Sequence, residues 1–105
     1  MDKREALKIA QKYISSLTGK YNIERAYLYG SFAKGTNHSD SDIDLALVFP
    51  SISDIIDVQI DLMQMRTDEE LLIEPHPFRK EDFNISNPVV AEILNNGIEI
   101  INFAA

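Results

Sequence analysis

The stretch YGSFAKGTNHSDSDIDLALVF, from Tyr29 to Phe49, decides the fold. Its second half, Ile43 to Phe49, is almost wholly apolar, which is typical of a strand buried on both faces of a sheet. Its first half contains glycines, an asparagine and several hydroxyl side chains, which predicts a loop with one helical turn beginning near Ser31. The stretch therefore predicts a buried strand that starts beside a polar loop.

Two carboxylates, Asp42 and Asp44, stand at the start of this strand. Side chains two residues apart on a strand point to the same face, so we expect them side by side. Adjacent carboxylates repel one another and destabilise a fold unless a cation lies between them. Ligands that are all oxygen favour a hard cation such as Mg²⁺, which keeps positions for water and substrate phosphate. The alternative is a solvated pair at a strand end.

Gly30 and Ser31 precede the possible helical turn. Glycine lets a phosphate approach the backbone closely, and N–H groups at a helix start favour anions. Ser31 adds a hydroxyl donor, and Gly35 would permit the reversal toward the aspartates. A Gly-Ser pair alone is most often an ordinary turn. Beside Asp42 and Asp44 it predicts a phosphate cradle next to a metal pair, as phosphoryl or nucleotidyl transfer requires.

The composition limits the classes of protein to which the chain can belong. With 105 residues, 45% of them hydrophobic, we expect one globular domain, residues 1–105. The chain has no cysteine, which excludes disulfides and thiolate sites, and no apolar stretch suited to a signal peptide or membrane span. We expect a cytoplasmic protein with no membrane association. Its net charge of −7 argues against stable nucleic-acid binding, because phosphate backbones would be repelled.

Hydrophobic periodicity and turn residues predict an α+β fold with one mixed β-sheet covered by helices. Proline cannot donate to a ladder, so Pro75 and Pro77 are expected to end the third strand. The expected helices span residues 2–17, 53–65 and 89–96, the last capped by Asn87 and stopped at Gly97. The expected strands span Ile23 to Tyr29, Ile43 to Phe49, Leu71 to Glu74 and Ile98 to Phe103.

Gly30-Ser31, ten intervening residues and then Asp42-Ile43-Asp44-Leu45 together resemble the signature of the polymerase-β-type nucleotidyltransferase superfamily. The short chain resembles its minimal nucleotidyltransferases. The resemblance implies the polymerase-β-like nucleotidyltransferase fold and two Mg²⁺ ions held by Asp42 and Asp44. It also implies that Gly30 and Ser31 bind the phosphates of ATP.

The superfamily usually carries a third carboxylate on a neighbouring strand, and Glu74 is the best match. Aspartate is commoner there, and the prolines that follow Glu74 depart from the pattern. In this interpretation Glu74 binds metal and accepts the proton of the attacking hydroxyl. The alternative is a surface residue on an edge strand.

Minimal nucleotidyltransferases are often paired with a small helical HEPN-type ribonuclease toxin. The resemblance therefore implies an antitoxin that transfers AMP from ATP to a hydroxyl of its partner protein. One alternative is a catalytically weak binding module that neutralises a partner by complex formation. Another is a small-molecule nucleotidyltransferase of the aminoglycoside type, which a chain without an acceptor domain disfavours.

Other polar residues near the motif have both functional and structural interpretations. Lys34 could contact the triphosphate as a point charge, or be solvated. Ser41 could donate to a phosphate or orient Asp42, or serve only the turn. His76 could line the mouth of the site, although a histidine between two prolines is more often structural. The acidic run 68–70 is expected to be a solvated helix end.

Overall fold

The computed structural model describes residues 1–101. Four strands, four α-helices and two short 3-10 helices are assigned within that range. The elements are α1 (Lys3–Leu17), β1 (Arg25–Tyr29), α2 (Ser31–Lys34), β2 (Ile43–Phe49), α3 (Ile55–Gln64), η1 (Asp68–Glu70), β3 (Ile73–Arg79), η2 (Lys80–Asp82), α4 (Pro88–Asn96) and β4 (Ile98–Ile100). The predicted α+β class is confirmed.

The strands form one mixed sheet in the order β3-β2-β1-β4. The central strands β1 and β2 are antiparallel, as are β1 and β4, whereas β2 and β3 are parallel. A parallel pair needs a crossover connection, and α3 supplies it. Because β2 lies inside the sheet and β3 at its edge, β2 can carry a residue with a strand partner on each side.

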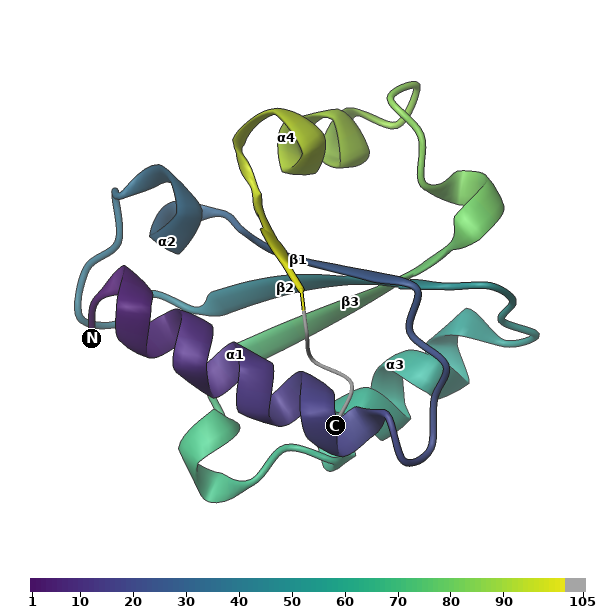
Figure 1. The fold of residues 1–105 in the computed structure, drawn as a ribbon, viewed down its shortest axis with the longest axis horizontal. Coiled ribbons are helices and arrows are strands. Elements are labelled where there is room, and N and C mark those ends of the chain that lie inside the picture. The colour runs from purple at the N-terminus through teal and green to yellow at the C-terminus, as the bar shows by residue number, and fades with distance from the viewer. Residues whose placement is uncertain (102–105) are drawn as a thin grey trace.

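One face of the sheet carries the main core. The odd-numbered side chains of β2, from Ile43 to Phe49, are buried there. Figure 1 shows α1 and α3 on this side of the sheet and α4 on the other. The Tyr13 hydroxyl donates to the Leu62 carbonyl at 2.6 Å and so ties α1 to α3. This layer packs on one face of the sheet, and Asp44, the polar residue of β2, lies on the other face.

The opposite face is covered only at one end. Tyr27 and Ala46 are buried against Ile93 of α4. Phe83 stacks on Tyr27, with 5.4 Å between the ring centroids. Because the even-numbered residues of β2 share this face, Asp44 lies on it too, two residues before the buried Ala46.

The predicted end of the third strand at Glu74 is wrong, because β3 continues through both prolines to Arg79. The carbonyls of Ile73 and Pro75 accept hydrogen bonds from the side chains of Arg66 and Gln59. The odd-numbered backbone groups therefore point to the free edge, where a missing N–H costs the ladder nothing. The even-numbered groups face β2, so the pairing is unbroken.

Smaller differences concern the ends of elements. The first strand begins at Arg25 rather than Ile23, and the last ends at Ile100, one residue before the end of the described range. Residues 102 and 103 of its predicted span lie outside that range. Asn87 caps α4 as predicted, its side chain accepting from the Val89 N–H at 2.9 Å. Glu70 was expected to be solvated but is buried, where its carboxylate accepts from the Thr67 N–H at 2.8 Å in a capping box.

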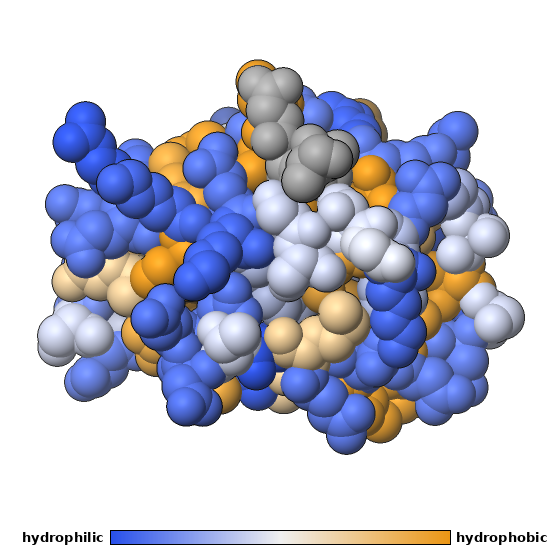
Figure 2. Space-filling model, turned by 60° about the horizontal axis from the view of Figure 1, so that its bottom comes forward, coloured by the Kyte–Doolittle hydropathy of each residue, from blue (hydrophilic) through white to orange (hydrophobic). Residues whose placement is uncertain are grey.

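Figure 2 shows one outer face of the molecule, on which hydrophilic side chains predominate and apolar ones form separate small areas. Among residues 1–101, no helix combines the length and the apolar character that crossing a membrane requires.

Candidate active site

Asp44 lies between two neighbours in the sheet register. Tyr29 of β1 is paired with it on one side and Glu74 of β3 on the other. Directly paired residues present their side chains on the same face, with Cβ atoms about 4.5–5.5 Å apart. The structure therefore brings Glu74 beside Asp44, at the start of the parallel β2–β3 pair. Both carboxylates are partly exposed.

The backbone of Gly30, the residue after Tyr29, packs against the Asp44 side chain. Its backbone has φ 76° and ψ −150°, a conformation that is essentially restricted to glycine. A Cβ at this position would lie 2.4 Å from the Asp44 Oδ2 atom. The predicted approach of the Gly-Ser bend to the aspartates is thus present at Asp44, and only a residue without a side chain can lie so close to this carboxylate.

Asp42 directly precedes β2 and is exposed. It is two residues from Asp44, so strand alternation places it toward the same face. Within residues 1–101, no three acidic, histidine or cysteine side chains are already clustered as a metal site. The donor chemistry nevertheless fits a hard divalent cation, because Asp42, Asp44 and Glu74 offer only carboxylate oxygens.

His76 joins this group, although the motif did not include it. Its Nε2 atom is 3.6 Å from the Asp44 Oδ1 atom, and its ring meets that of Tyr29 edge to face, with centroids 5.7 Å apart. His76 is two residues beyond Glu74 on β3, so it shares the face of the carboxylates. Alternation along β3 would have found it if the prolines had not been expected to end the strand.

The carboxylates make this end of the face electronegative. Burial raises the pKa of the Tyr29 hydroxyl well above its usual value, and the charges of Asp44 and Glu74 raise it further. Tyr29 therefore stays protonated at neutral pH and can serve only as a neutral group beside Asp44. A group of carboxylates of this kind favours a cation over a bare phosphate.

The remaining predicted residues are arranged differently. Ser31 is the first residue of α2 and is partly exposed beside Gly30. Ser41 is buried, and its Oγ atom accepts from the His38 N–H at 2.8 Å, so its side chain serves the turn. Lys34 lies 2.5 Å from the Glu92 carboxylate of α4, and this bond is the main reason that the pKa of Glu92 is lowered. Lys34 therefore links α2 to α4.

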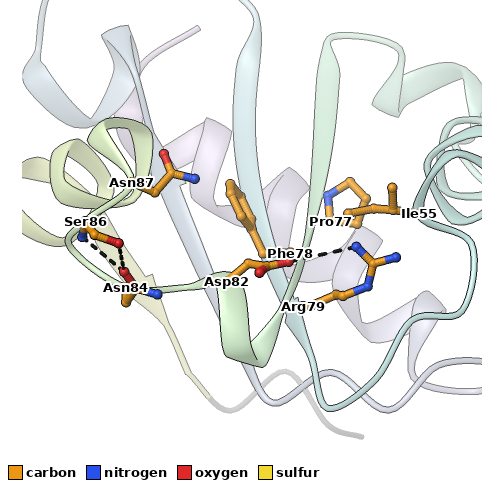
Figure 3. Close-up of a pocket in the computed structure, with 8 residues that line it drawn as sticks. All are labelled: Ile55, Pro77, Phe78, Arg79, Asp82, Asn84, Ser86 and Asn87. Carbon is orange, nitrogen blue, oxygen red and sulfur yellow. Dashed lines mark hydrogen bonds and ion pairs between the residues drawn. The ribbon is translucent and has the colours of Figure 1, made fainter.

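Two hollows lie along β3, and neither is lined by Asp44 or Glu74. The larger, of about 540 Å³, is at the C-terminal end of the strand (Figure 3). Its charged groups, Arg79 and Asp82, pair with one another at 3.8 Å. At about 3.3 Å per residue this end is some 16 Å from Glu74, so we place the chemistry at the carboxylates instead.

Several solved structures share this fold. A protein from Sulfolobus solfataricus described as a nucleotidyltransferase is 17% identical, with 92% of this chain and 80% of that one covered and a TM-score of 0.68. A toxin–antitoxin structure with AMP-PNP is 20% identical, with 94% and 72% covered and a TM-score of 0.60. A mutant of the toxin–antitoxin MntA-HpeT is 17% identical, with 94% and 72% covered and a TM-score of 0.57.

No curated protein matches the sequence of this chain. The family described as "Polymerase beta, Nucleotidyltransferase" matches residues 11–103, which include every residue of the site. Because this match covers most of the chain, the chain belongs to the polymerase beta nucleotidyltransferase family.

Proposed function

We propose that this chain transfers AMP from ATP to a hydroxyl of a partner protein in a Mg²⁺-dependent reaction. The observation that carries the proposal is the row formed by Tyr29, Asp44 and Glu74, with the backbone of Gly30 against Asp44. This row supplies a metal-binding carboxylate, a second carboxylate beside it and an open approach for phosphate. These are the groups that nucleotidyl transfer needs.

Each side of Asp44 has its own role. Gly30 and Ser31 lie on the β1 side and hold the β- and γ-phosphates through the backbone and the Ser31 hydroxyl. Glu74 lies on the β3 side and accepts the proton of the acceptor hydroxyl. The acceptor oxygen forms a bond to the α-phosphorus, the bond from that phosphorus to the bridging oxygen of the β-phosphate breaks, and pyrophosphate leaves.

Asp42, Asp44 and Glu74 would hold the two Mg²⁺ ions. When bound, the ions neutralise the negative charge that develops around the α-phosphorus. The side chains of Lys34 and Ser41 have other partners in this structure, so we assign neither a necessary part in the reaction. Tyr29 packs beside Asp44 as a neutral group.

The partner is proposed to be a small helical HEPN-type toxin, which the chain would inactivate as a cytoplasmic antitoxin. Toxin–antitoxin structures are among those that share the fold, one of them with AMP-PNP. The fold likeness favours this role over a small-molecule nucleotidyltransferase. It does not by itself distinguish modification of the partner from neutralisation by binding, so the test must separate the two.

The test uses the protein encoded beside this chain as acceptor, with Mg²⁺ and ATP labelled at either the α- or the γ-phosphate. We expect only the α-label to appear on the acceptor. Asp44→Asn should reduce transfer at least about 100-fold, because a metal ion contributes several kcal/mol to transition-state stabilisation. Asp40→Asn, an exposed aspartate of the preceding turn, is the matched control and should leave transfer unchanged.

Transfer of the γ-label, or full transfer by Asp44→Asn, would contradict the proposal. The double variant Asp42→Asn/Asp44→Asn addresses the binding alternative. If this variant still neutralises the partner in cells as well as the wild type does, complex formation suffices and the transfer is not the protective step.

A further inference from the structure

A shallow apolar hollow lies beside the proposed site, between α3 and the free edge of β3. It has a volume of about 330 Å³, and we call it the α3–β3 hollow. Ile56, one of the residues that line it, is 68% exposed. The hollow is lined by Ile55, Ile56, Gln59, His76, Pro77 and Phe78.

His76 connects the hollow to the carboxylates. His76 is one of the residues that line the hollow, and its Nε2 atom lies 3.6 Å from the Asp44 Oδ1 atom. Glu74 is two residues away on the same strand face, about 7 Å along β3. A group seated in the hollow is therefore within a residue or two of the carboxylate that is proposed to receive the acceptor proton.

The edge of β3 restricts what can bind there. Pro75 and Pro77 have no N–H to offer, and the carbonyls of Ile73 and Pro75 already accept from Arg66 and Gln59. A polypeptide cannot extend the sheet along this segment, because most of the backbone groups that would pair with it are absent or occupied. A partner must therefore engage the hollow through its side chains.

The direction of the reaction indicates which substrate the hollow receives. In an in-line displacement the entering and leaving oxygens lie on opposite sides of the phosphorus. The phosphates are assigned to Gly30 and Ser31 on the β1 side of Asp44, so the acceptor enters from the β3 side. The hollow is on that β3 side, which favours the acceptor over the pyrophosphate as its occupant.

Charge around the hollow indicates the character of the acceptor. Asp54 and Asp57, in the first turn of α3 next to Ile55 and Ile56, are both exposed. Asp54 uses its side chain to cap the helix, and neither aspartate has an ion pair among residues 1–101. Two exposed aspartates at the start of α3, next in sequence to residues that line the hollow, complement a segment in which an apolar side chain is flanked by lysine or arginine.

We propose that the α3–β3 hollow is the docking site of the acceptor protein, which seats an apolar side chain there within a basic segment and presents its hydroxyl to Glu74. This inference rests on the proposed function for its direction but makes a separate claim about binding. It assigns to α3 and β3 the recognition of the substrate, which the catalytic motif does not provide.

The test is a binding measurement that does not require transfer. The probe is a fluorescent twelve-residue peptide with a central Leu-Tyr pair flanked by lysines, titrated into the full chain and followed by anisotropy and by amide NMR shifts. We expect saturable binding and shifts at residues 55–59 and 76–78. Ile56→Gln should weaken binding about tenfold, because the peptide loses most of one apolar contact.

Ile85→Gln is the control, since Ile85 is also exposed, at 75%, but does not line the hollow. Equal binding by the two variants, or equal affinity for a peptide in which serine replaces the central leucine, would overturn the docking site. Shifts at Ile56 and Gln59 caused by ATP and not by peptide would assign the hollow to the nucleobase and overturn it too. Peptide binding without any transfer would instead leave the docking site standing and count against the proposed function.

Discussion

At the residue scale, Gly30 and Gly35 form a natural comparison. Both have backbone angles that side chains rarely adopt, with φ of 76° and 77°. A Cβ at Gly30 would lie 2.4 Å from Asp44 Oδ2, whereas a Cβ at Gly35 would meet nothing within 4 Å among the described residues. The steric demand at Gly30 is therefore specific to the site, and the one at Gly35 is confined to the backbone.

We expect Gly30→Ala to lower the free energy of unfolding by about 2–3 kcal/mol and to remove most transfer activity, because Asp44 must move. Gly35→Ala should cost about 1 kcal/mol from its left-handed backbone and keep its activity. Urea unfolding and the α-label transfer assay measure the two effects. A folded Gly30→Ala protein with wild-type activity would show that Asp44 need not sit against this backbone.

Individual site residues differed in how far the sequence could predict them. Gly30 and Asp44 were expected to lie close together from the spacing of the Gly-Ser pair and the two aspartates, and the structure has Gly30 against Asp44. Glu74 was placed by resemblance, and its pairing with Asp44 came only with the sheet. His76 was considered for the mouth of the site, but its place between two prolines favoured a structural role, and its contact with Asp44 came only with the sheet. Lys34 could not be placed, because its partner Glu92 is distant in the sequence.

At the element scale, β3 carries the main error. The sequence predicts β2 with its bounds, and α3 and α4 to within two residues at each end, because these have long periodic patterns and side-chain caps. Pro75 and Pro77 are compatible with a strand only at a sheet edge, with their nitrogens turned outward. That condition depends on the strand order, which no local pattern gives.

The prolines of β3 also protect the edge. We expect Pro75→Val/Pro77→Val to restore two outward N–H groups next to an apolar hollow and so to promote self-association. Sedimentation velocity at increasing protein concentration measures the self-association. Pro88→Ala, at the start of α4, is the control and should leave the mass distribution unchanged. A double variant that sediments like the wild type at all concentrations would show that the edge is protected by other means.

At the scale of the whole molecule, α1 and α3 are joined by a polar cluster at their C-terminal ends. Asp61 of α3 lies 2.7 Å from the Lys20 amino group and accepts a hydrogen bond from the Tyr21 hydroxyl. The bond from Lys20, followed by that from Tyr21, lowers the pKa of Asp61. Burial and the bond to Asp61 raise the pKa of Tyr21 to about 12.

A carboxyl whose pKa is lower in the folded state stabilises the fold above its unfolded pKa of about 4 and loses that effect as the pH falls. We therefore expect Asp61→Asn to lower the urea midpoint at pH 7 and to differ progressively less from the wild type toward pH 3. Asp40→Asn should follow the wild type throughout. If the urea midpoint of Asp61→Asn were below that of the wild type by the same amount at pH 7 and pH 3, the charge of Asp61 would contribute nothing to stability.

The arrangement of the helices around the sheet was the feature that the sequence predicted least well. Composition and periodicity predict a mixed sheet with helices, and that class is observed. They do not indicate that α4 covers only one end of the second face, which leaves Asp44 and Glu74 partly exposed. This incomplete cover depends on contacts such as Phe83 with Tyr27, between residues more than fifty positions apart.

In the proposed mechanism, Asp42, Asp44 and Glu74 hold the metal on which the nucleotide reacts. Paramagnetic Mn²⁺, added in small amounts with ATP to the isotope-labelled chain, broadens the amide signals nearest to it. We expect the amide signals of residues 42–44 and 74–76 to lose intensity first in the wild type. In the Asp44→Asn variant these signals should keep their intensity. First loss at another acidic segment, such as Asp68 to Glu70, with 42–44 and 74–76 unaffected, would contradict the account.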